Sequence, residues 1–118
     1  MPFDSSSLDT AVVTDPEVLR QALGRLVDRL GRLPERHWAA GYEVAFVLVQ
    51  HLRELTMDLG DVGPPQVPRI AARAANVQVA VLGEDLLRCA STCRDSAKVA
   101  AAMKRALAAV DASTSALP

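Results

Sequence analysis

The sequence has few aromatic residues and few cysteines, and each shortage narrows the kind of protein it can be. Its 118 residues include one tryptophan, one tyrosine, two phenylalanines and two cysteines. Two cysteines are too few for a disulfide framework or an all-thiolate zinc site, and few aromatic rings leave little surface for stacking on nucleic-acid bases. The core must therefore be aliphatic, built from twenty Ala, fifteen Leu and fourteen Val. This alanine-rich mixture favours closely spaced helices.

Long apolar runs and a strong excess of charge are also lacking. The longest uncharged runs are residues 74–83 and 44–52, whereas a membrane-spanning helix needs about 20 apolar residues. The formal net charge is -1, far from the basic balance that general nucleic-acid binding requires. The first seven residues show no basic stretch followed by an apolar one, so no secretory signal is expected. We expect a cytoplasmic protein without a membrane partner, and the composition disfavours nucleic acid as a partner.

The periodicity of apolar residues divides the chain into three parts. Residues 1–13 have no repeating apolar pattern and are rich in Ser and Asp, so we expect a flexible N-terminal arm. Apolar residues recur at helical spacing over residues 14–112, which predicts a single helical domain. Residues 113–118 are expected to fray.

The first two helices should meet at a tight turn. Thr14 and Glu17 form a capping pattern that starts the first helix, and a seam of leucines follows at spacings of three and four until Pro34 ends it. The second helix should cover residues 35–59, with Gly60 supplying a left-handed cap at its end.

The second half of the chain begins with a stretch rich in Gly and Pro. Residues 60–68 contain two Gly and three Pro, which predicts a stiff connection between two helical hairpins. From Arg69 an apolar seam runs in one register as far as Val110. This seam leaves two architectures open, because it fits either two helices or one long helix.

Weak helix formers in the middle of this seam favour a break near Ser91, where Thr92 and Asp95 resemble a capping pair. With the break, the chain is an all-α protein, and an antiparallel up-down-up-down four-helix bundle is the most economical topology. Without it, the chain has three helices, the last one long and continuous, and must pair with a second chain in a dimer. We adopt the four-helix bundle.

The sequence offers no set of residues typical of catalysis or metal binding. Cys89 and Cys93 are four residues apart, but zinc usually needs four protein ligands, or three and a water, and we interpret both as small apolar residues of the seam. The two histidines, His37 and His51, lie about 21 Å apart along one helix at about 1.5 Å per residue, so they cannot share a site. We expect no enzymatic activity, no cofactor and no metal.

Four arginines recur at spacings of four, three and four and form a basic stripe beside the leucine seam of the first helix. They are Arg25, Arg29, Arg32 and Arg36. Guanidinium groups can hold phosphates or acidic helices through their forked donors, so weak nucleic-acid contact is one hypothesis. The alternative is a solvated face whose arginines pair with neighbouring carboxylates.

The middle of the second helix is apolar on every side, and such a helix must be covered all round. We therefore predict an interaction surface formed by Val44, Phe46, Val47 and Val49. The leading hypothesis for function is a non-catalytic helical protein–protein interaction module. It would self-associate as a homodimer and act as an adaptor or regulatory accessory protein.

A second hypothesis belongs to another class, a helical bundle that binds a small molecule in an apolar pocket. Ligand sites in bundles are built from inward side chains of facing helices. The candidate lining residues are Trp38, Tyr42, Phe46 and Met103.

Overall fold

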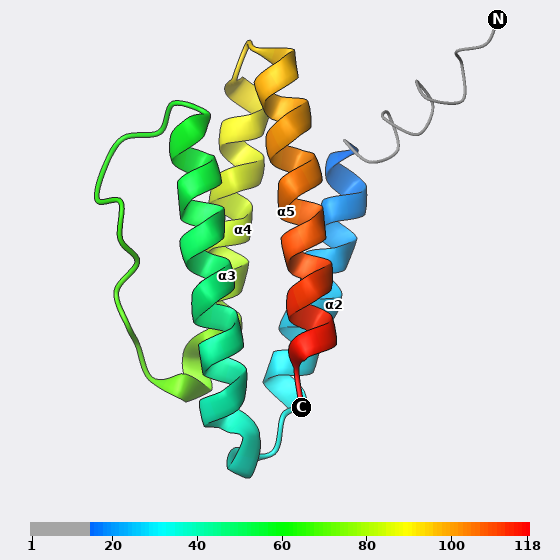
Figure 1. Cartoon of the computed structure of the whole chain (residues 1–118), viewed down its shortest axis with the longest axis vertical. Helices are drawn as coiled ribbons and strands as arrows, with labels where there is room; N and C mark the ends of the chain where they lie inside the picture. The colour runs from blue at the N-terminus through cyan, green and yellow to red at the C-terminus, as the bar shows by residue number, and fades with distance from the viewer. Residues whose placement is uncertain (1–14) are drawn as a thin grey trace, which may run out of the picture.

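The computed structural model describes residues 15–118, which form four helices packed in one bundle (Figure 1). The predicted all-α four-helix bundle is therefore confirmed. Residues 1–14, which include the predicted arm and the predicted Thr14 cap, lie outside the described residues. The helices are α2 (Pro16–Arg32), α3 (Trp38–Asp58), α4 (Ala75–Thr92) and α5 (Ser96–Ala116), with single 3₁₀ turns at η1 (Glu35–His37) and η2 (Ala72–Ala74).

A capping aspartate, a proline and a glycine mark the ends of the first two helices. The side chain of Asp15 caps α2 by accepting a hydrogen bond from the Glu17 amide at 2.9 Å. Leu33, before Pro34, is extended with φ -63° and ψ 136°, as expected for a residue that precedes proline. The predicted second helix is a 3₁₀ turn followed by α3, and Gly60 adopts a φ of 104° after its end.

The break between α4 and α5 is confirmed, which excludes one long helix. Cys93 is extended with φ -74° and ψ 132°, and the side chain of Asp95 caps α5 by accepting a hydrogen bond from the Lys98 amide at 3.1 Å. The predicted partner Thr92 does not cap α5. Its hydroxyl donates back to the Cys89 carbonyl at 3.2 Å, inside the last turn of α4.

One connection departs from the expected up-down-up-down order. The crossover segment, residues 59–71, returns along the whole of α3, so that α4 starts beside the beginning of α3 and runs parallel to it (Figure 1). The segment is long enough to do so, because extended backbone at about 3.1 Å per residue reaches about 40 Å, and α3 is about 31 Å long. As a result α2 and α3 each pack along both α4 and α5.

The core is aliphatic, as the composition predicted, and small residues let the helices approach closely. A Cβ added to Gly83 of α4 would lie 2.8 Å from Leu23 Cδ1 of α2, and one added to Gly41 would collide with the Leu33 side chain. Helix α5 continues to Ala116, beyond residue 112, where fraying was expected to begin. The reason is Leu117, which is buried beside Gly41 and anchors this end to α3.

Candidate functional site

Arg53 holds one end of the crossover segment against α3. Its side chain is buried, its Nη1 donates to Asp61 Oδ2 at 2.6 Å, and its Nε donates to the Pro64 carbonyl at 3.0 Å. The side-chain hydrogen bond from Arg53 lowers the pKa of Asp61 below its ordinary value, although partial desolvation opposes this shift. The forked guanidinium thus joins a helix to two points of the segment.

Further side chains of α3 hold the rest of the crossover segment. Gln50 Oε1 accepts a hydrogen bond from the Val67 amide at 3.1 Å. Arg69 extends over the Phe46 ring, with its guanidinium carbon 4.1 Å from the ring centroid, and pairs with Glu43 at 2.9 Å. The segment therefore covers one side of the apolar stretch of α3 from within the chain.

The four residues predicted as an interaction surface do not share one face. Val49 is fully buried in the core, so its assignment to a surface is wrong. Phe46 is partly buried beneath Arg69, and Val44 packs partly against the core. Only Val47 is widely exposed, at 71%, because it lies on the side of α3 opposite Ala45.

Val47 borders a shallow apolar hollow between α3 and α5, the two helices nearest the viewer in Figure 1. Its volume is about 290 Å³ and no ionisable side chain lines it. A second hollow of about 260 Å³ lies further along the same pair of helices. The first is lined by Val44, Val47, Ala112, Ser113 and Ala116, and the second by Leu55, Asp58, Lys98, Ala101, Ala102 and Arg105.

Charges flank these hollows with mostly opposite signs on the two helices, and the exception is the exposed carboxylate Asp111 of α5. The exposed side of α3 carries Glu54 and Asp58, and that of α5 carries Lys98, Lys104 and Arg105. None of the five takes part in an ion pair within the described residues. Sequence reasoning missed this pattern. The helical spacing of Glu54 and Asp58, four residues apart, and of Lys98 and Arg105, seven apart, could have indicated it.

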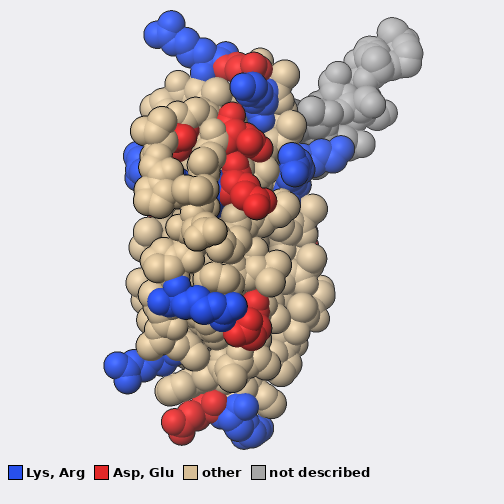
Figure 2. All heavy atoms as spheres, turned by 60° about the vertical axis from the view of Figure 1, so that its left-hand side comes forward, with Lys and Arg blue, Asp and Glu red and all other residues tan. Residues whose placement is uncertain are grey.

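The predicted basic stripe is dispersed rather than gathered. Arg29 donates to the Thr114 carbonyl at 3.0 Å, and Arg32 lies 3.3 Å from Asp28. Arg36 sits in η1, beyond the end of α2, while Arg25 lies on the exposed surface of α2. Figure 2 shows another face, over the crossover segment, where blue and red side chains lie in small mixed groups on a mostly uncharged surface.

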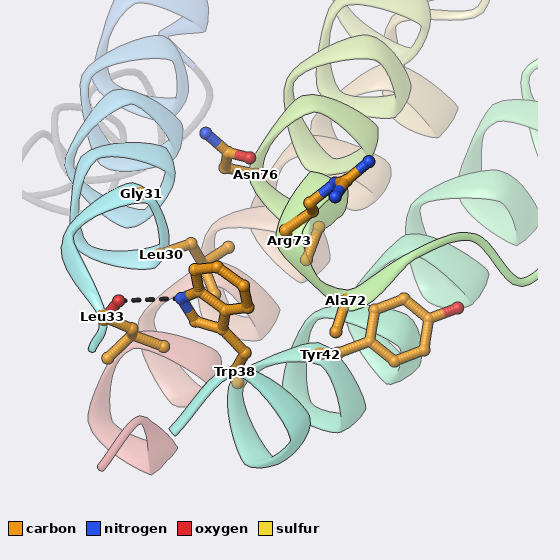
Figure 3. Close-up of a pocket in the computed structure, with 10 residues that line it drawn as sticks. Leu30, Gly31, Leu33, Trp38, Tyr42, Ala72, Arg73 and Asn76 are labelled. Atoms are coloured by element: carbon orange, nitrogen blue, oxygen red, sulfur yellow. Dashed lines mark hydrogen bonds between the residues drawn. The ribbon is translucent and has the colours of Figure 1, made fainter. Parts of the chain in front are cut away.

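The four residues predicted to line a ligand pocket are separated. Met103 is buried in the core and Phe46 lies under Arg69, and neither lines the pocket that Trp38 and Tyr42 share. Trp38 and Tyr42 do line one pocket, of about 90 Å³, at the end of the bundle where α2, α3 and α4 meet (Figure 3). Sequence reasoning missed its two polar residues, Arg73 and Asn76, because it treated residues from Arg69 onward only as a helical seam.

The two cysteines are free and partly buried. Burial raises the pKa of the Cys89 thiol, and the nearby negative charge of Asp61 acts in the same direction, so this group is a poor thiolate nucleophile. Over residues 15–118, no cluster of three or more His, Cys, Asp or Glu could hold a metal ion.

Comparison with protein-family models, curated proteins and solved structures finds no match. None of the helices described here is long and apolar enough to cross a membrane.

Proposed function

We propose that this chain is a non-catalytic helical interaction module that self-associates as a dimer through the α3–α5 face. The observation that carries the proposal is Val47, an apolar side chain exposed at 71% beside an apolar hollow of about 290 Å³. Burying such a side chain stabilises an association by about 1.5–3 kcal/mol when its surface is fully removed from water.

The shape of this face suits a second copy of the same chain. In a two-fold symmetric dimer each patch must complement itself. Val47 projects from α3, and the adjacent hollow is walled by Ala112 and Ala116 of α5. A two-fold axis parallel to the helices lays α3 of one copy over α5 of the other, so that each Val47 enters the partner's hollow.

The charges on this face favour the same pairing. With the two-fold axis parallel to the helices, residues of the two copies that lie at the same height along the bundle face each other. Asp58 lies at the height of Lys98 and Arg105, because the three side chains line one hollow. The carboxylates of α3 would then face the bases of α5 in the partner. Complementary potentials of this kind fix the orientation of an interface and disfavour wrong partners.

Within this proposal, the dimer acts in the cytoplasm as an adaptor or regulatory accessory protein. The crossover segment already covers another side of the apolar stretch of α3, the one with Phe46 and Gln50. The α3–α5 face is thus the side of that stretch left for a partner.

Val47→Asp tests the proposal. It places a carboxylate in the apolar contact, and we expect the dimer dissociation constant to rise about a hundredfold or more. The measurement is molar mass by light scattering across a concentration series. The matched control is Val81→Asp on α4, which replaces another helical valine, 52% exposed, away from this face.

A dimer lost in Val47→Asp and kept in Val81→Asp supports the proposed face. Equal dissociation in both variants, or none in either, contradicts it. Circular dichroism verifies that both variants remain helical, so that unfolding is not mistaken for dissociation.

A further inference from the structure

We propose that the pocket beside Trp38 binds a short-chain aliphatic carboxylate, with Arg73 holding the carboxylate. The pocket lies where the end of α2, the start of α3 and the start of α4 meet, and Figure 3 shows the indole ring between the first two of these, with Arg73 and Asn76 on the α4 side. This site is separate from the α3–α5 face and does not depend on self-association.

The apolar walls of the pocket are fixed in place by hydrogen bonds. Trp38 Nε1 donates to the Leu33 carbonyl at 2.9 Å, which sets the plane of the indole. The Tyr42 hydroxyl accepts from the Ile70 amide at 3.0 Å, which ties the phenol ring to the crossover segment. Leu30 is buried and completes the apolar lining. Preorganised walls of this kind lower the entropy cost of binding.

The two polar side chains of the pocket have no partner among the described residues. Neither Arg73 nor Asn76 forms a side-chain hydrogen bond or an ion pair within residues 15–118. A guanidinium presents several N–H donors in a plane that matches a carboxylate. Asn76 lies in the first turn of α4 and Arg73 in η2 just before it, where the dipole of α4 also favours a negative charge.

Gly31 of α2 leaves space for the Asn76 side chain at the polar side of the pocket. A Cβ added to Gly31 of α2 would lie 3.3 Å from Asn76 Nδ2, which is a tight contact. With hydrogen at this position, Asn76 can sit against α2 and close the pocket on the side away from Trp38.

The volume of the pocket decides the size of the ligand. At about 90 Å³, it is smaller than the cavity of about 150 Å³ that holds a benzene molecule in a well-studied protein. An aromatic acid is therefore too large to be enclosed. A carboxylate with a short aliphatic chain places its charge at Arg73 and its carbon atoms against the indole.

Titration with sodium butyrate tests this assignment, because Trp38 is the one tryptophan of the chain and reports on the pocket. We expect a saturable change in the indole N–H resonance and in tryptophan fluorescence at millimolar butyrate. Arg73→Gln should weaken binding about tenfold or more, since it removes a charge-assisted hydrogen bond. Arg94→Gln, which removes an exposed arginine at the other end of the bundle, should leave binding unchanged.

Two control titrations distinguish binding at this site from nonspecific hydrophobic contact and from the effect of ionic strength. 1-Butanol has the apolar chain without the charge, and sodium chloride supplies the ionic strength without the chain. Saturable binding of butyrate that exceeds both and is lost in Arg73→Gln supports the proposal. It is overturned by the absence of saturation, by equal binding of butanol, or by equal binding in Arg73→Gln.

Discussion

Glycine residues determine how closely the helices of this bundle approach one another. Gly83 faces Leu23 across the α2–α4 contact, and Gly41 faces Leu33 at the end of α2. Gly24, also on α2, has no atom near the place of a Cβ. The same residue type therefore has opposite consequences for stability in two places of one bundle.

Gly83→Ala should lower the free energy of unfolding by about 1–3 kcal/mol, because the added methyl group forces the Leu23 side chain out of its packing. Gly24→Ala is the matched control and should raise it by about 0.5–1 kcal/mol, since alanine is the better helix former at an open position. Urea unfolding of both variants measures these changes. Changes of equal sign and size in the two variants would refute the packing argument.

The sequence located the candidate surface only to within a turn of helix. In a stretch as apolar as residues 44–49, every position has the character of a core residue, so Val47 and Val49 cannot be distinguished by hydrophobicity. Packing distinguishes them, since Val49 is fully buried and Val47 is exposed at 71%. Arg73 could not have been found either, because its place in the pocket depends on where the crossover segment delivers the start of α4.

Among the elements, the helix boundaries at Pro34, Gly60 and Asp95 were predictable, whereas the start of α4 at Ala75 rather than Arg69 and the direction of this helix were not. Pro34, Gly60 and Asp95 act on the adjacent backbone, so their effects can be read locally. The course of the crossover segment depends on contacts distant in sequence, such as Arg53 with Pro64 and Gln50 with Val67. A stretch rich in Pro and Gly predicts a connection between helices. The length of the extended segment and its hydrogen bonds with Arg53 and Gln50 of α3 determine at which end of α3 the next helix begins.

The ion pair between Arg53 and Asp61 should make the stability of this connection depend on pH. Arg53 favours the charged carboxylate and so lowers the pKa of Asp61 in the folded protein. The unfolded chain therefore binds the proton more readily, and the stabilisation is present above about pH 4 and is lost as the pH falls through the folded pKa.

Asp61→Asn measures this contribution. At pH 7 the variant should be less stable than the wild-type protein, and the difference should shrink as the pH falls below about 4. Urea unfolding at several pH values provides the comparison. Asp111→Asn, which removes an exposed carboxylate with no ion pair among the described residues, should change stability little. A difference between Asp61→Asn and wild type that stays constant with pH would show that the ion pair does not stabilise the fold.

For the molecule as a whole, the central question is what covers the apolar stretch of α3. The bundle core covers the side that contains Ala45 and Val49, and the crossover segment covers Phe46 with Arg69. The remaining side carries Val47 and borders an apolar hollow, with carboxylates on α3 and bases on α5 that form no ion pair within residues 15–118. A second copy, related by a two-fold axis parallel to the helices, would cover this side and bring the opposite charges together.

Sedimentation equilibrium of the wild-type protein at micromolar concentration is the decisive test of self-association. The chain has a mass of 12.6 kDa. Self-association through the α3–α5 face predicts twice that mass, with a shift towards the single chain on dilution. A mass of 12.6 kDa at every concentration would contradict self-association.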